Sequence, residues 1–178
     1  MAKKSNKVRV AIIGVGNCAN ALVQGVQYYK NAPDDAEIPG LMHATVGGYH
    51  VRDIEFSAAF DVVTTKVGKD LSEAMWAYPN DTIKFADVPY LNVPVYRGMT
   101  HDGIGKYLSQ KVEKAPGPTD DIIKILRDTK TDVVVNFMPV GSEMATKWYV
   151  EQAIEAGCAF VNGIPVFIAS SPYWSKRF

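Results

Sequence analysis

The sequence predicts an α/β protein with a doubly wound parallel sheet, and three observations support this fold class. Short runs such as Val8–Ile13 are almost entirely apolar and rich in β-branched residues, as expected of strands buried on both faces of a parallel sheet. Segments with apolar residues at three- and four-residue steps, typical of amphipathic helices, alternate with these runs. A glycine-rich turn joins the first run to the first such segment. Strands and helices in this alternation build a parallel sheet with right-handed crossovers.

The glycine-rich turn follows the first expected strand directly. Gly14, Gly16 and Ala19 match the G-x-G-x-x-G/A spacing of dinucleotide-binding folds. In that motif the first glycine permits a tight turn, the second lets the backbone approach a pyrophosphate, and the third small residue lets helix and strand pack closely. The first amides of the following helix favour the same anion. The alternative is a turn that only reverses the chain, but the flanking strand and helix favour the dinucleotide interpretation.

Composition and charge exclude several classes of protein. With 178 residues, the chain is long enough for one full domain and too short for two of ordinary size. Its 19 Lys and Arg residues balance 19 Asp and Glu residues, so no basic excess points to nucleic acid or to an anionic membrane. No apolar run approaches the length that spans a bilayer, and we expect no secretory signal.

The cysteines and histidines indicate neither a disulfide nor a metal site. Cys18 falls in the glycine-rich turn and Cys158 just before an expected strand, so reduced thiols in a cytoplasmic protein are the simpler interpretation. The three histidines are scattered and match no zinc-binding spacing. We therefore expect a cytoplasmic protein without a metal.

The first helix is expected to end near residue 31, before Pro33. Residues 32–50 then carry glycines and prolines with little periodicity, which predicts a loop inserted between the first helix and the second strand. Long ordered loops of this kind tend to be functional.

The second strand is expected over Ile54–Asp61. A dinucleotide fold holds the adenosine ribose with an acidic residue at the end of this strand, usually about 20 residues after the glycines. The inserted loop places Asp61 further away but leaves its position at the strand end unchanged. The alternative role for Asp61 is the N-cap of a helix beginning at Val62. Asp70, on the same connection, either faces the cofactor or caps a helix.

Residues 77–101 are irregular because several prolines interrupt them, and a short strand is expected at 93–96. The polar, glycine-rich stretch 100–106 contains the adjacent residues His101 and Asp102. Adjacent side chains need not converge, and surface turns commonly have this composition. We therefore interpret the pair as part of a turn and not as a catalytic site.

A turn at 115–118 precedes a helix that Thr119 is expected to cap. The next buried strand is expected over 132–137, and Gly141 and Ser142 open the helix that follows. This is the second small-residue turn at the carboxyl end of a strand, where open α/β sheets bind their ligands. Ser142 serves as an N-cap, meets the ligand, or does both, because its hydroxyl and its amide are distinct groups.

The last expected elements lie at the same edge of the sheet. Tyr149, on the preceding helix, is either a core residue or part of the cofactor wall, and the core is the more common place. Residues 159–165 predict a strand and a polar turn that contains Asn162. Residues 170–172 begin another helix, and its aromatic residues, such as Trp174, lack an expected partner. We therefore expect a longer protein truncated before a second domain.

Eight segments carry distinctive patterns, and several of them are far more specific than the glycine spacing: 14–19 (GVGNCA), 23–26 (VQGV), 39–43 (PGLMH), 49–54 (YHVRDI), 58–61 (AAFD), 102–107 (DGIGKY), 139–143 (PVGSE) and 165–170 (PVFIAS). Together they resemble the bacterial inositol-3-phosphate synthases (myo-inositol-1-phosphate synthases). The resemblance extends from Val8 over almost the whole chain and covers the NAD-binding half of such an enzyme. It implies a Rossmann-like NAD-binding domain over residues 1–178, without the second domain for catalysis and oligomerisation.

The resemblance also implies a reaction. Such enzymes convert D-glucose 6-phosphate into 1D-myo-inositol 3-phosphate, for inositol and phospholipid biosynthesis. Bound NAD+ oxidises C5 of the open-chain sugar, C6 attacks the C1 aldehyde in an aldol step, and the NADH returns its hydride, so the enzyme is an isomerase. The lysines that stabilise the enolate and the sheet that forms the homo-oligomer lie in the other half. We therefore assign no catalytic residue here and expect the chain alone to be inactive.

The resemblance further assigns residues to parts of the dinucleotide. It places five residues of the glycine turn on the pyrophosphate: Gly14, Gly16, Asn17, Cys18 and Ala19. It places Asp61 at the adenosine, with Asp70 as a second candidate there. The residues near the nicotinamide are Gly141, Ser142 and Asn162.

Two alternatives stay open on the sequence alone. The chain is also compatible with the cofactor domain of an NAD-dependent dehydrogenase, because fold alone does not separate the two. It is also compatible with a non-enzymatic nucleotide-binding or interaction module that uses the fold without chemistry. A dehydrogenase would release NADH in step with substrate consumption, whereas a synthase shows no net NADH. An interaction module would bind a protein partner and ignore the dinucleotide.

Overall fold

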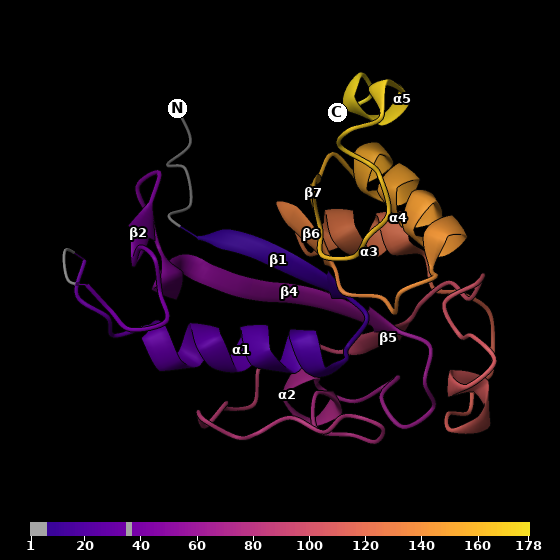
Figure 1. Ribbon diagram of the computed structural model, residues 1–178, viewed down its shortest axis with the longest axis horizontal. Coiled ribbons are helices and arrows are strands. Elements are labelled where there is room, and N and C mark those ends of the chain that lie inside the picture. The colour runs from indigo at the N-terminus through magenta and orange to yellow at the C-terminus, as the bar shows by residue number, and fades with distance from the viewer. Residues whose placement is uncertain (1–6, 35–36) are drawn as a thin grey trace.

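The computed structural model describes residues 7–34 and 37–178 and contains a five-stranded sheet that is parallel throughout (Figure 1). From one edge to the other its strands are β5 (Val95–Arg97), β4 (Ile54–Asp61), β1 (Val8–Ile13), β6 (Val133–Asn136) and β7 (Ala159–Asn162). Numbered along the chain, these strands follow the order 3-2-1-4-5 of a doubly wound dinucleotide-binding sheet. The predicted fold class is therefore confirmed.

Helices cover both faces of this sheet, with α1 and α2 on one face and α3 and α4 on the other (Figure 1). The helices are α1 (Asn17–Tyr29), α2 (Leu71–Ala74), α3 (Ile122–Asp128), α4 (Glu143–Ala156) and α5 (Pro172–Ser175), with short 3-10 helices η1 (Val51–Asp53) and η2 (Leu108–Gln110). In the ranges that the structure describes, none of them is long and apolar enough to cross a membrane.

The central strand β1 serves two cores. Because side chains alternate along a strand, Val10 and Ile12 enter the core beneath α1 and α2. Ala11 and Ile13 enter the core beneath α3 and α4. All four side chains are at most 6% exposed, which explains the nearly uninterrupted apolar run in the sequence. β1 pairs with β4 through a register shift between Val10 and Ala11, and with β6 in regular register.

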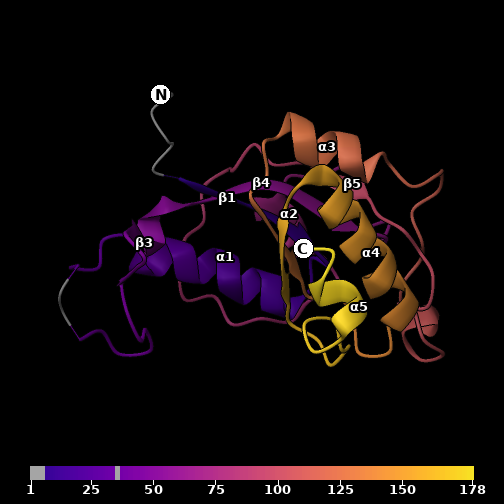
Figure 2. The ribbon, with the colours of Figure 1, turned by 90° about the horizontal axis from the view of Figure 1, so that it is seen from above.

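The segment between α1 and β4 differs from the predicted loop. Within its described part, β2 (Thr45–Val46) and β3 (Tyr49–His50) form an antiparallel hairpin. The two glycines of its turn, Gly47 and Gly48, have φ of 61° and 83°, the left-handed backbone that a two-residue hairpin turn requires. The hairpin lies at the opposite end of the molecule from α4 and α5 (Figures 1 and 2). The insertion is therefore remote from the carboxyl ends of the strands.

Two local predictions near the helix ends are wrong. Thr119 does not cap α3. The cap is Asp121, whose carboxylate accepts a hydrogen bond from the Lys124 amide at 3.0 Å. Trp174 does not lack a partner, because it is 6% exposed and forms a small core with Val150.

Candidate functional site

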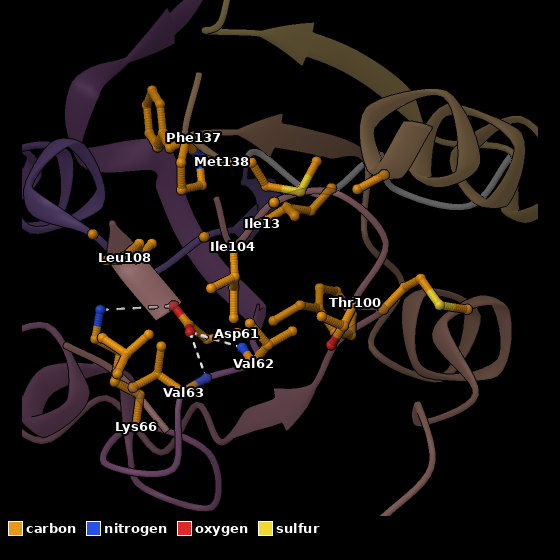
Figure 3. Close-up of a pocket in the computed structure, with 18 of the residues that line it drawn as sticks. Ile13, Asp61, Val62, Val63, Lys66, Thr100, Ile104, Leu108, Phe137 and Met138 are labelled. Atoms are coloured by element: carbon orange, nitrogen blue, oxygen red, sulfur yellow. Dashed lines mark hydrogen bonds and ion pairs between the residues drawn. The ribbon is translucent and has the colours of Figure 1, made fainter. Parts of the chain in front are cut away.

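The candidate site lies at the carboxyl ends of the strands, where the strand order reverses between β1 and β6. Ligands of open α/β sheets bind at this position. A cavity of about 240 Å³ is found here (Figure 3). It is lined by the glycine turn after β1, the start of the β4–β5 connection and the loop after β6. Residues 99–112, called the strap below, contribute a fourth wall.

The two glycines of the turn have different structural roles. Gly14 has a φ of 83°, and a Cβ there would lie 2.9 Å from the carbonyl oxygen of Phe137. The fold itself therefore requires Gly14, because the turn packs closely against the loop after β6. Gly16 has a φ of −95°, and a Cβ there would meet no atom within 4 Å. Neither backbone strain nor packing explains this glycine, and the open space beside it is available to a ligand.

The start of α1 has no cap from the chain. Gly16 is the N-cap residue, no side chain caps the helix, and the first turn holds no acidic residue. The first amides of a helix lack partners within the helix, and the helix dipole favours an anion beside them. The Asn17 side chain is engaged elsewhere, because its Oδ1 accepts hydrogen bonds from the Asp81 amide and the Thr82 hydroxyl, each at 2.9 Å. The start of α1 thus has the properties of an anion site.

The start of α4, at the second predicted ligand turn, is occupied by the chain. The Asp102 carboxylate accepts hydrogen bonds from the amides of Met144 at 2.7 Å and Ala145 at 3.0 Å. Partial burial acts to raise the pKa of Asp102, but these bonds hold it below its usual value. The Ser142 hydroxyl donates instead to the Pro139 carbonyl at 2.6 Å and makes no cap. Ser142 is therefore the N-cap residue of α4 by position, as one of its predicted roles has it, but its side chain does not cap the helix.

Asp61 lies at the carboxyl end of β4, as predicted, but its carboxylate already binds the chain (Figure 3). Oδ1 accepts hydrogen bonds from the amides of Val62 at 2.7 Å and Val63 at 2.9 Å. Oδ2 accepts one from the Val15 amide at 2.8 Å. No helix begins at Val62, so the alternative role as a helix N-cap is wrong. A carboxylate has about four lone-pair sites, which leaves about one, on Oδ2, for a donor outside the chain.

Lys66 is a buried cation beside this carboxylate, with 3% of its surface exposed. Its Nζ donates to the Val15 carbonyl at 2.7 Å and to Asn80 Oδ1 at 2.8 Å. It lies 3.8 Å from Asp61 Oδ2 (Figure 3). Burial lowers the pKa of Lys66, against the attraction of Asp61. Asp61 and Lys66 thus form a buried ion pair, and both hydrogen-bond the backbone of Val15 in the glycine turn.

Asp70 caps α2 and does not line the cavity. Its carboxylate accepts hydrogen bonds from the amides of Ser72 at 2.9 Å, Leu91 at 3.2 Å and Val93 at 2.7 Å. Burial alone would raise the pKa of Asp70, but these bonds hold it below its usual value. Of the two roles predicted for Asp70, the structure shows the helix cap, and the place at the adenosine has no support in this geometry.

Tyr149 and Asn162 are both held by contacts within the fold. Tyr149 borders the cavity but is 3% exposed, its hydroxyl accepts a hydrogen bond from the Met99 amide at 2.9 Å, and burial raises its pKa. Asn162 does not line the cavity, and its side-chain amide donates to the carbonyls of Ile164 at 2.9 Å and Val166 at 2.7 Å. Tyr149 thus fits both roles predicted for it, and Asn162 stabilises the turn after β7.

The predicted site residues therefore divide into two sets. Five line the cavity: Gly14, Gly16, Asn17, Asp61 and Tyr149. The others do not: Cys18, Ala19, Asp70, Gly141, Ser142 and Asn162. Cys18 and Ala19 still belong to the first turn of α1, so their backbone amides are part of the anion site described above.

The strap supplies apolar side chains to the cavity. Ile104, Leu108 and Val112 line it, and Ile104 lies near the middle of the view in Figure 3. Thr100 adds a hydroxyl oxygen that is buried without a hydrogen-bond partner in the described structure. An apolar cavity with a few polar groups is the usual environment of a small-molecule ligand.

Sequence reasoning missed Lys66, Asn80 and the strap. Lys66 and Asn80 contact Val15 from 51 and 65 positions away, so no local pattern reports them. The signal available for the strap was segment 102–107, which contributes to the family resemblance. Within residues 7–34 and 37–178, no group of three or more His, Cys, Asp or Glu side chains could hold a metal ion.

Comparison with curated proteins finds close relatives over the whole chain. The chain is 56% identical over 178 residues to the inositol-3-phosphate synthase of Mycolicibacterium smegmatis, which covers all of this chain and 49% of that protein. It is 57% identical over 174 residues to the inositol-3-phosphate synthase of Mycobacterium tuberculosis, covering 98% of this chain and 47% of that protein. The chain thus spans about half the length of the curated relatives it matches. No protein-family model matches it.

Comparison with solved structures finds proteins of the same fold. The crystal structure of Ari2 is 31% identical, superimposes with a TM-score of 0.81 and matches 97% of this chain and 49% of that one. A myo-inositol-1-phosphate synthase-related protein from Thermotoga maritima is 26% identical, with a TM-score of 0.70 over 96% of this chain and 51% of that one. Both comparisons support the α/β fold.

Proposed function

We propose that this chain, which is homologous over its whole length to about half of the inositol-3-phosphate synthases, forms the NAD-binding part of such an enzyme. The observation that carries the proposal is the uncapped start of α1, which opens beside Gly16 into a cavity bounded by Asp61. An anion site and a ribose acceptor at the end of the second strand of the sheet are the two groups that a dinucleotide requires.

The residues of the cavity fit an adenine dinucleotide. The backbone amides of Gly16, Asn17, Cys18 and Ala19 would bind the pyrophosphate. The remaining lone pair of Asp61 Oδ2 would accept a hydrogen bond from one ribose hydroxyl, and the negative charge disfavours a 2′-phosphate, so NAD is expected over NADP. Apolar side chains of the strap, with the Thr100 hydroxyl, would enclose the adenine.

The activity of the complete protein is part of the same proposal. As in its relatives by name, it would produce inositol 3-phosphate, with D-glucose 6-phosphate as the substrate and no net change in NAD. Bound NAD supplies the hydride chemistry, and this chain would bind and orient the cofactor. A cytoplasmic location and homo-oligomeric assembly of the complete protein also belong to the proposal. The identity to synthases of more than 50% favours this interpretation over a dehydrogenase domain or an interaction module.

Replacement of Gly16 by valine tests the proposal. A Cβ at Gly16 meets nothing in the fold, so Gly16→Val should fold normally while its side chain blocks the approach of the pyrophosphate. Calorimetry should show NAD+ binding weakened by about tenfold or more, which corresponds to about 1.4 kcal/mol.

Gly25→Val is the matched control, because Gly25 also has open space at its Cβ position but neither lines the cavity nor belongs to the strap. It should leave the affinity unchanged. Equal NAD+ affinity of the wild type and Gly16→Val would contradict the proposed pyrophosphate site.

A further inference from the structure

The glycine turn is held by side chains from outside the glycine motif, and Lys66 is the charged one among its donors. The Lys66 ammonium is surrounded by the Val15 carbonyl at 2.7 Å, Asn80 Oδ1 at 2.8 Å and Asp61 Oδ2 at 3.8 Å. An ammonium group has three protons and no acceptor. It donates hydrogen bonds to Val15 and Asn80 and forms an ion pair with Asp61, and all three contacts favour its protonated form.

Val15 is the residue through which these groups act. Its amide donates to Asp61 Oδ2 at 2.8 Å. Its carbonyl accepts from Lys66 Nζ at 2.7 Å and from the Asn80 side-chain amide at 2.9 Å. The Val15 side chain is fully buried. The backbone of Val15 is thus fixed at both its donor and its acceptor by polar side chains of the β4–β5 connection and the end of β4.

Fixing the Val15 carbonyl also fixes the Gly16 amide. The two groups belong to one peptide unit, which is planar and trans, so the C=O and N–H bonds point in opposite directions. A carbonyl held by Lys66 and Asn80 therefore sets the direction of the Gly16 N–H. Gly16 lines the cavity, and the space beside its Cα is open.

We infer that Lys66 is a positioning residue of the dinucleotide site, which holds the Val15–Gly16 peptide so that the Gly16 amide faces the pyrophosphate. This inference rests on the proposed function. It assigns Lys66 to the phosphate part of the ligand and not to the adenosine, because the peptide that it holds belongs to the turn.

The burial of Lys66 supports a role beyond stability. Taking a lysine out of water is costly, and an apolar residue of similar size in the same place often gives equal or greater stability. Asn80 already donates to the Val15 carbonyl, so the carbonyl would keep a partner without Lys66. The additional charged donor makes the carbonyl more rigidly held, since hydrogen bonds from charged groups are stronger than neutral ones.

The test compares ligands that differ in their phosphates. Lys66→Met keeps most of the apolar length of the side chain but removes its donor, and Lys66→Gln keeps a neutral donor. Calorimetric titrations of each variant use NAD+, ADP and adenosine. We expect Lys66→Met to bind NAD+ and ADP about tenfold or more weakly, as the loss of a charge-assisted hydrogen bond implies. Adenosine affinity should change little, and Lys66→Gln should recover part of the loss.

Lys69→Met is the matched control, because Lys69 is an exposed lysine of the same connection that does not line the cavity. It should bind all three ligands like the wild type. A thermal unfolding transition of each variant checks that it folds.

Three outcomes would overturn the inference. They are an unchanged affinity of Lys66→Met for NAD+, an equal loss for adenosine and ADP, and the failure of both Lys66 variants to fold, which would make Lys66 a residue of the folding core. A wild-type chain that binds neither NAD+ nor ADP would overturn the proposed function and this inference with it. The wild-type titration therefore separates the two failures.

Discussion

At the scale of single residues, the charged groups of the site bind the chain itself. Asp61 holds the glycine turn and the turn after β4, with hydrogen bonds to Val15, Val62 and Val63. Lys66 holds the other side of Val15. Such contacts fix the geometry before a ligand arrives, and preorganisation of this kind reduces the entropy lost on binding.

The lowered pKa of Lys66 predicts how stability depends on pH. An unfolded lysine titrates near pH 10.4, and burial places the folded pKa below that value despite the attraction of Asp61. Between the two values the unfolded chain binds more protons, so the stability of the wild type rises with pH there. At lower pH both states are protonated and this gain is absent.

This effect is measured by thermal unfolding of the wild type and Lys66→Met between about pH 7.5 and 10. The range extends about three pH units below the pKa of an unfolded lysine. The difference between their midpoints should move in favour of the wild type as the pH rises. Subtraction of the variant removes the titration of tyrosines and cysteines. A difference that is constant over this range would contradict the prediction.

At the scale of the elements, two helices begin at the same edge of the sheet with opposite chemistry. Asp102 fills the start of α4, whereas the start of α1 carries no side-chain cap. Because Asp102 belongs to the strap, the hydrogen bonds that cap α4 also attach this wall of the cavity to the helix. The unfilled start of α1 is then the end that a pyrophosphate can occupy.

Replacing Asp102 should therefore loosen the strap. In Asp102→Ala the amides of Met144 and Ala145 lose their acceptor, and loss of a helix cap costs about 0.5–2 kcal/mol of stability. Hydrogen exchange should show faster exchange over 99–112 and at the first turn of α4. Asp102→Asn, which keeps one of the two accepting oxygens, should exchange at a rate between those of Asp102→Ala and the wild type. Unchanged exchange in Asp102→Ala would show that the strap is held by other contacts.

The helices and strands of the fold were largely predictable from the sequence, whereas the side-chain contacts between distant elements were not. The strands of the sheet are short apolar runs, and the carboxyl ends of parallel strands meet at one edge, so the positions of Gly14 and Asp61 follow from local patterns. The cap of α4 does not, because Asp102 lies 42 positions before the amide of Met144. A local pattern can point only to a nearby residue, so it indicated Ser142 as the capping side chain. The Ser142 hydroxyl instead donates a hydrogen bond to the Pro139 carbonyl.

At the scale of the whole molecule, the described cavity contains few groups able to do chemistry. The ionic groups among its lining residues are Asp61 and Lys66, and both are engaged by the chain. An enolate and a sugar phosphate would need further cations. This arrangement suits a cofactor-binding part, in agreement with a chain that spans about half of its relatives.

The chain alone should therefore not convert glucose 6-phosphate into inositol phosphate. Loss of a single group that stabilises charge in a transition state costs about a hundredfold or more in rate, and several would be missing. Phosphate release after periodate oxidation of the product measures the activity, with the full-length Mycolicibacterium smegmatis synthase as the positive control. Turnover near that of the complete enzyme would place the catalytic groups within these 178 residues.

The central place of β1 has a consequence for synthesis on the ribosome. One edge of β1 can pair with β4 early, but its other edge waits for β6, and the contact that begins this pairing joins Arg9 to Asp132, 123 positions later. At about 5–20 residues per second, that interval lasts roughly 6–25 s. During it the nascent chain presents an unpaired, apolar strand edge, the kind of surface on which chains aggregate. β1 thus leaves the ribosome well before β6, the strand that completes its pairing, and we expect the nascent chain to need protection from aggregation during this interval.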